Sequence, residues 1–213
     1  MRLLYRLPWW LRLFYKDAVW RKDSSARCVY LTFDDGPVPE VTPQLLDLLD
    51  RYHVKATFFW VGENVERNPE LAREVVRRGH AVGNHTYNHL RGWRTCLRPY
   101  TENILRAERA MEEALGGMPS GSKLFRPPYG RAGLLKHGWL RRHGYEVVLW
   151  DIITHDYNPR YTPEEIERAV LRYVRDGSVI LFHDSLKASR NMLSSLPHVI
   201  ERLLASGYEF RRF

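Results

Sequence analysis

Two adjacent carboxylates, Asp34 and Asp35, follow an apolar run and precede Gly36 and Pro37. Neighbouring side chains of a strand point to opposite faces, so both carboxylates can reach one site only if the glycine and proline bend the backbone there. One carboxylate could then bind a metal ion while the other handles a proton. The same residues, Asp-Asp-Gly-Pro, are also common in ordinary structural turns. The pair alone therefore does not distinguish a structural turn from a catalytic site.

His85 and His89 are four residues apart, which is one helical turn, so both imidazoles can face one ion. The chain contains nine histidines, and a single such pair arises easily by chance. Two histidines joined by a carboxylate from another strand end form a His₂Asp set, which leaves coordination positions open for water and substrate. That combination is much harder to obtain by accident.

Arg126 opens the sequence RPPYG at 126–130, a rigid turn with an arginine at its base. In a structural loop this arginine would form a surface ion pair. In a catalytic site it would hold a carboxylate ionised and oriented. The turn fits both interpretations.

Apolar patterns and turn residues predict seven strands separated by six helical stretches. The expected strands are 29–33, 56–59, 81–84, 123–125, 146–150, 178–182 and 208–211. The expected helices are 43–52, 68–79, 100–115, 132–143, 162–173 and 196–206. This alternation implies parallel pairing through right-handed crossovers. We predict one α/β domain built as a distorted (β/α)₇ barrel, with an open sheet as the alternative at this length.

The unusual polar residues follow the expected strands at their carboxyl ends. In chain order they are Asp34, Asp35, His85, His89, Arg126, Asp156, His183 and Asp184. Parallel α/β folds build their sites on that face. The pattern therefore favours one shared site.

Five ordered stretches closely resemble the motifs of the NodB-homology polysaccharide deacetylases, carbohydrate esterase family 4. They are TFDDGP at 32–37, HTxxH at 85–89, RPPYG at 126–130, Trp150 with Asp156, and LFH at 181–183. The resemblance covers residues 29–213, and the five motifs together are highly specific.

The resemblance implies a role for each matching residue. Asp35, His85 and His89 would bind a divalent metal, usually zinc, with cobalt and nickel as alternatives. Asp34 would be the general base and Arg126 its partner; His183 would be the general acid and Asp156 would tune it. The backbone N–H of Tyr129 would hold the oxyanion with the metal, while Leu181 and Trp150 would wall the pocket for the acetyl methyl.

The chemistry of amide hydrolysis agrees with these roles, because it needs an activated water, a stabilised oxyanion and a proton for the amine. We predict a metal-dependent hydrolase that removes N-acetyl, less often O-acetyl, groups from an amino-sugar polysaccharide or oligosaccharide such as peptidoglycan or chitooligosaccharide. One alternative is a deacylase, deformylase or cyclic-amide hydrolase for a small molecule. Another is a catalytically silent carbohydrate-binding module, which would have no need of Asp34 and His183.

Two positions depart from the family pattern. Tyr157 stands where a tryptophan is usual, and Ile153 stands where many relatives carry an acidic residue. These changes leave the metal set intact but alter the expected substrate groove near the fifth strand. His155 is expected to be a loop histidine.

Length and composition fit one ordinary globular domain, with 213 residues, 44% hydrophobic and 27% charged. The net charge of +8 favours attraction to anionic surfaces and polymers. We expect no nucleic-acid partner, because zinc-finger spacing and an RNA-binding aromatic signature are both missing. Cys28 and Cys96 make no disulfide framework.

Residues 1–22 hold three tryptophans and six Lys or Arg against one Asp. Recurring charges exclude a signal peptide and a membrane span. We favour the interpretation that this segment covers an open side of the core with its large apolar side chains, Trp9, Trp10, Leu13, Phe14 and Trp20. The alternative is that the segment lies on an anionic membrane surface. We therefore divide the chain into a segment at 1–28 and a deacetylase domain at 29–213. The expected location is cytoplasmic or peripheral to a membrane, and the sequence does not indicate an oligomeric state.

Overall fold

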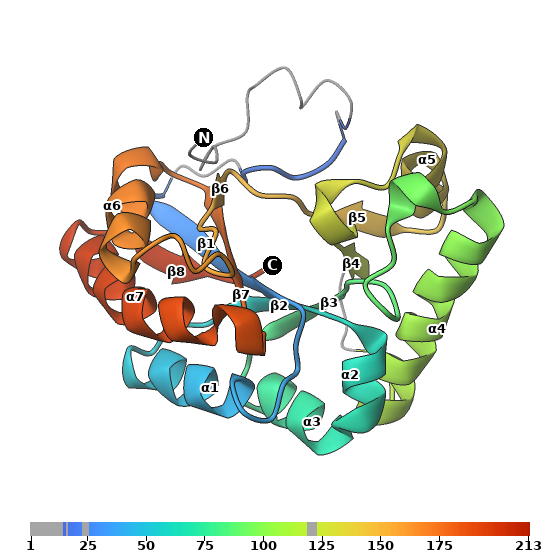
Figure 1. Ribbon diagram of the computed structural model, residues 1–213, viewed down its shortest axis with the longest axis horizontal. Helices are drawn as coiled ribbons and strands as arrows, with labels where there is room; N and C mark the ends of the chain where they lie inside the picture. Colours follow the sequence, from blue (N-terminus) through green and yellow to red (C-terminus); the bar gives the residue numbers. More distant parts are fainter. Residues whose placement is uncertain (1–14, 16, 23–25, 119–122) are drawn as a thin grey trace.

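Strand β1 (Cys28–Asp34) lies in the interior of one parallel sheet, between β2 and β7 (Figure 1). The structure is a computed structural model that describes residues 15, 17–22, 26–118 and 123–213. The other strands are β2 (Thr57–Trp60), β3 (Ala81–Asn84), β4 (Lys123–Phe125), β5 (Tyr145–Val147), β6 (Ile152–Ile153), β7 (Ser178–His183) and β8 (Glu209–Arg211). Seven of them follow the order β5-β4-β3-β2-β1-β7-β6, and β8 pairs with β1. The curled parallel sheet confirms the predicted fold class.

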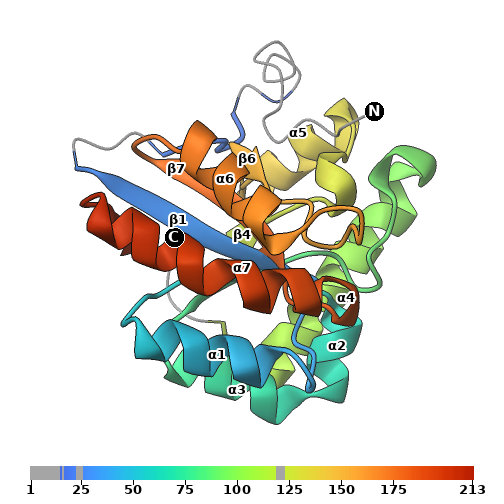
Figure 2. The ribbon, with the colours of Figure 1, turned by 60° about the vertical axis from the view of Figure 1, so that its left-hand side comes forward.

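Helices cover the outside of the sheet, from α6 and α7 through α1, α3 and α2 to α4 and α5 (Figures 1 and 2). Their bounds are α1 (Thr42–Arg51), α2 (Gly62–Arg67), α3 (Pro69–Arg77), α4 (Leu97–Leu115), α5 (Leu134–Arg142), α6 (Pro163–Tyr173) and α7 (Leu186–Ala205). Two 3₁₀ turns, η2 (Gly92–Arg94) and η3 (Pro128–Gly130), lie in loops. Helix α6 begins at the predicted capping box, where Thr162 and Glu165 bond each other's backbone N–H.

Four elements differ from the predicted ones. The expected strand at 146–150 is the shorter β5, and β6 is an additional strand with two residues. Helix α2 was not predicted. Helix α7 begins at Leu186, well before residue 196, and contains Pro197 in its interior. A proline normally marks a helix start, so the sequence pattern placed the start there.

Alternation along β1 decides which side chains reach the site. Leu31 and Phe33 pack into a core beneath the helices, whereas Tyr30 belongs to a second core on the other face. Because side chains of a strand alternate, Thr32 and Asp34 share the face of Tyr30. Alternation along β7 likewise places His183 on the face of Leu181, which lies in the second core. The concave inner face therefore receives both Asp34 and His183.

Part of the N-terminal segment fills the open side of the sheet. Val19 N–H donates to the carbonyl of Val147, and Lys22 N–H donates to that of Gly177, so this segment connects the end of β5 to the start of β7. Trp20 is buried in the second core. The predictions for Trp9, Trp10, Leu13 and Phe14 lie outside the described residues, and membrane contact stays a prediction. Among the described helices, none combines the length and hydrophobicity that crossing a membrane requires.

Candidate active site

Asp34 is held by a fully buried arginine. Arg126 Nη1 donates to Asp34 Oδ1 at 2.7 Å and to the Thr32 hydroxyl at 2.9 Å. Its remaining nitrogens donate to the carbonyls of Val148 and Leu149, and the guanidinium lies 4.1 Å from the centre of the Phe59 ring. Arg126 is 0% exposed and Asp34 is 3% exposed. A buried ion pair with this many hydrogen bonds fixes the carboxylate in one orientation.

Asp35, His85 and His89 converge on one point. Asp35 Oδ1 lies 3.8 Å from His85 Nε2 and 3.5 Å from His89 Nε2, and one donor atom from each residue lies within 4.8 Å of the others. The residues come from two loops, one after β1 and one after β3. Asp35 Oδ1 is buried and has no hydrogen-bond partner among the described residues. A buried carboxylate oxygen without a donor is costly, so this arrangement fits a bound cation.

The surroundings of His85 leave one ring nitrogen available. Its Nδ1 lies 2.7 Å from the carbonyl oxygen of Arg126 and must donate its hydrogen there, because a carbonyl only accepts. Burial, assisted by the neighbouring His89, lowers the pKa of His85 to about 3. The ring is therefore neutral at pH 7, and Nε2 presents a lone pair toward Asp35. These three residues form a group that can hold a metal ion.

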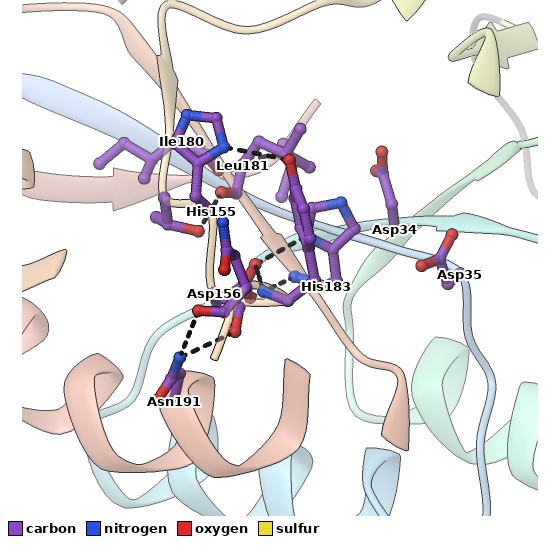
Figure 3. A network of polar contacts seen from close by, with 12 residues as sticks. Asp34, Asp35, His155, Asp156, Ile180, Leu181, His183 and Asn191 are labelled. Carbon is purple, nitrogen blue, oxygen red and sulfur yellow. Dashed lines mark hydrogen bonds and ion pairs between the residues drawn. The ribbon is translucent and has the colours of Figure 1, made fainter. Parts of the chain in front are cut away.

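His183 faces the carboxylate pair from β7. In Figure 3 its side chain lies between Asp156 on one side and Asp34 and Asp35 on the other. Asp156 accepts from the His183 backbone N–H at 2.8 Å, and its other oxygen lies 2.8 Å from His183 Nδ1. Burial alone would lower the pKa of His183, but the Asp156 carboxylate outweighs it and raises the pKa to about 9. His183 is therefore mainly an imidazolium at pH 7.

A cavity of 390 Å³ joins these groups. It is lined by eight predicted site residues: Asp34, Asp35, His85, His89, Tyr129, Trp150, Leu181 and His183. The other two, Arg126 and Asp156, lie behind the lining and act through Asp34 and His183. Ile153 and Tyr157, the two departures from the family pattern, also line the cavity. His155 is buried in its loop, where Nδ1 lies 3.1 Å from the Tyr157 hydroxyl.

Asp184 holds the loop that carries the two aspartates, a role that the sequence did not reveal. Its carboxylate accepts from the Gly36 N–H and from the Thr42 hydroxyl, both at 2.9 Å. Its own N–H donates to the carbonyl of Asp34 at 3.0 Å. Burial raises the pKa of Asp184 to about 7, while the two donors oppose that rise. Its place directly after His183 was the available signal. Asn191 donates to the carbonyl of Asp156, and no sequence signal indicated this contact.

Gly36 has no room for a side chain, and we expect its replacement to destabilise the fold. A Cβ there would lie 1.9 Å from Asp184 Oδ2. Gly36→Ala should lower the free energy of unfolding by about 1–3 kcal/mol, as overpacking does. Gly138→Ala is the control, because that Cβ would meet only Arg142 at 3.9 Å, within helix α5. Urea denaturation should show a lower free energy of unfolding for Gly36→Ala and no decrease for Gly138→Ala. Equal denaturation midpoints for the two variants would contradict this expectation.

Residues 21–148 match the family model described as polysaccharide deacetylase. The chain belongs to the polysaccharide deacetylase family. The match includes the motifs of Asp34, His85 and Arg126, and longer alignments extend the deacetylase similarity further. A peptidoglycan-N-acetylglucosamine deacetylase of Bacillus cereus is 33% identical over 195 residues, which cover 90% of this chain and 88% of the relative.

Two further deacetylases have similar coverage. A chitooligosaccharide deacetylase of Sinorhizobium fredii is 38% identical over 174 residues, covering 81% of this chain and 79% of the relative. A crystal structure of a peptidoglycan N-acetylglucosamine deacetylase superposes with a TM-score of 0.88 at 30% identity, covering 97% of this chain and 95% of the other. The predicted family and enzyme class are confirmed.

Proposed function

We propose that this polysaccharide deacetylase hydrolyses N-acetyl groups of an amino-sugar polymer or oligosaccharide with the help of zinc. The observation that carries the proposal is the convergence of Asp35, His85 and His89 beside a buried carboxylate, with a protonated histidine facing them. Relatives named for peptidoglycan and for chitooligosaccharides support an acetylated carbohydrate as substrate.

The donor set fits a divalent metal. One carboxylate oxygen and two imidazole nitrogens are ligands that zinc accepts, and three protein ligands leave room for water and substrate. Asp35 Oδ1 lacks another partner among the described residues, and His85 is fixed in the tautomer that a ligand needs. When bound, the cation would act as a Lewis acid on water and on the substrate carbonyl.

Asp34 is placed to accept a proton from the attacking water. Its Oδ1 is held by Arg126, while Oδ2 lies 3.8 Å from His85 Nε2 and therefore close to the proposed metal ligands. The hydrogen bond from Arg126 holds Oδ1 in place, so that Oδ2 points toward the proposed metal ligands. Arg126 thus works as a positioning residue.

His183 is placed to donate a proton to the departing amine. An amine is a poor leaving group unless it is protonated, so an acid on the cavity wall is required. Asp156 keeps His183 in its acid form, because its carboxylate stabilises the imidazolium through Nδ1. Nε2 of His183 is then left to give its proton to the substrate. The backbone N–H of Tyr129 would hold the oxyanion, and Trp150 and Leu181 would contact the acetyl methyl.

The His183–Asp156 pair leads to an expected pH dependence. Because the His183 pKa lies near 9, the acid is protonated below that pH, and turnover should fall as the pH rises through it. Asp156→Asn removes the charge that raises this pKa, so the alkaline limb of the kcat/KM profile should move to lower pH by about one unit or more. An unmoved limb in a folded variant would contradict the assignment of His183 as the acid.

Acetate release tests the proposed function. The protein, loaded with zinc or cobalt, is incubated with chitooligosaccharides, peptidoglycan fragments and acetylated xylan. Acetate from either amino-sugar substrate supports N-deacetylation, whereas release from xylan alone would indicate O-deacetylation. If all three substrates remain intact, the proposal of a carbohydrate substrate is wrong.

A further inference from the structure

A second cavity adjoins the catalytic one. It has a volume of 380 Å³ and shares Tyr129 and Trp150 with its neighbour. Its other aromatic walls are Tyr15, Trp20 and Trp93, of which the first two come from the N-terminal segment. Small-ligand sites commonly measure about 300–1,000 Å³, so this cavity can hold a molecule of sugar size. The reaction proposed above uses only Tyr129 and Trp150 from this lining.

Two aromatic rings of the cavity face outward. Trp93 is 43% exposed and Tyr129 is 50% exposed, and their ring centroids lie 5.2 Å apart at an angle of 82°. Exposed aromatic side chains that adjoin a site commonly belong to a binding surface. The apolar C–H face of a pyranose can pack against such rings while its hydroxyls stay in water. An oligosaccharide whose reacting residue sits in the first cavity can therefore continue over Tyr129.

The rim of this cavity is positively charged. Arg131 lines the cavity and is exposed, and the Arg91 guanidinium lies 5.5 Å from the centre of the Tyr129 ring. Within residues 26–118 and 123–213 and the described part of the N-terminal segment, neither arginine has a carboxylate at ion-pair distance. Such unpaired charges beside an aromatic surface can bind an anionic group.

A close backbone contact holds these groups together. A Cβ on Gly92 would lie 2.8 Å from the Arg131 carbonyl oxygen, so turn η2 lies directly against residue 131. Trp93 and Arg91 are therefore held next to Arg131 by packing. The aromatic surface and the two charges form one rim.

We infer that this second cavity is a saccharide subsite for a sugar ring that carries a carboxylate. The inference rests on the proposed function, because the ring is a neighbour of the one that loses its acetyl group. It gives the substrate class as an acidic amino-sugar polymer, in which carboxylate-bearing rings accompany N-acetylated ones. A neutral polymer would use the aromatic surface without the arginines.

The test compares two N-acetylated oligosaccharides of equal length with the full-length protein. One contains N-acetylglucosamine only, and the other alternates it with N-acetylmuramic acid, whose lactyl group carries a carboxylate. The double variant Arg91→Gln, Arg131→Gln should lower kcat/KM for the acidic oligosaccharide by about tenfold, the scale of two exposed ion pairs, and change the neutral one by less than about twofold. Added salt should lower the wild-type preference.

The matched control is the double variant Arg109→Gln, Arg142→Gln, which removes two exposed charges that line neither cavity. It should leave both substrates within about twofold of the wild type. Equal effects of the Arg91 and Arg131 changes on both substrates, or no effect on either, would overturn the subsite.

Failure of the proposed function gives a different result. If the wild type releases acetate from neither substrate, calorimetric binding of the acidic oligosaccharide still tests the subsite. Binding that is about tenfold weaker in the Arg91 and Arg131 variant supports the subsite without turnover. Equal binding, or none to the wild type, overturns it.

Discussion

Asp34→Asn is expected to lower kcat by about 10²- to 10⁴-fold, the usual contribution of a general base, while the protein keeps its metal. The amide has the shape of the carboxylate and can still accept from Arg126, but it cannot take a proton from water. Acetate release measures the loss, and elemental analysis measures the metal. A silent carbohydrate-binding module would instead show no wild-type turnover to lose.

The variant also leaves the Arg126 charge buried without its counter-ion, so some loss of stability is expected. Circular dichroism at the assay temperature separates unfolding from lost chemistry. Asp176→Asn, at an exposed carboxylate outside the cavity, is the matched control and should keep full activity. Full turnover by a folded, metal-loaded Asp34→Asn protein would exclude Asp34 as the base.

His85→Ala is expected to remove both the bound metal and the activity. His85 contributes a donor nitrogen and belongs to the converging set with Asp35 and His89. Loss of a residue that only hydrogen-bonds a metal ligand weakens metal binding by about 10–100-fold. Loss of the ligand His85 itself should weaken it further. Titration with zinc or cobalt gives the affinity, and acetate release gives the rate.

His198→Ala is the control for this change, because His198 is exposed on helix α7 away from the cavity. It should bind metal and turn over like the wild type. If the His85 variant binds metal as tightly as the wild type, the metal lies elsewhere.

Much of the site could be predicted because the decisive signals are local in sequence. Alternation along β1 and β7 puts Asp34 and His183 on the same concave face, and parallel strands bring their carboxyl ends together. Arg126 follows β4 in the same way. The positions of these residues at strand ends and the order of the motifs were therefore enough to predict one shared site.

Contacts between distant parts of the chain could not be predicted in this way. The Gly36 N–H donates to the Asp184 carboxylate 148 residues away. The place of Asp184 after His183 indicates that it lies near the site, but not which group it bonds. Trp20 lies in the second core because its segment bonds backbone groups at the end of β5 and just before β7. The first half of α7 was not predicted, because Pro197 is a strong local helix breaker. Packing of the helix overrides that local preference.

Removal and return of metal in the wild-type protein tests the central claim most directly. Acetate release from an N-acetylated oligosaccharide is measured before chelation, after chelation, and after addition of one equivalent of zinc. Activity should disappear with the chelator and return with the zinc, because Asp35, His85 and His89 gather around one cation position. Undiminished activity in protein shown by elemental analysis to be free of metal would contradict metal-dependent deacetylation.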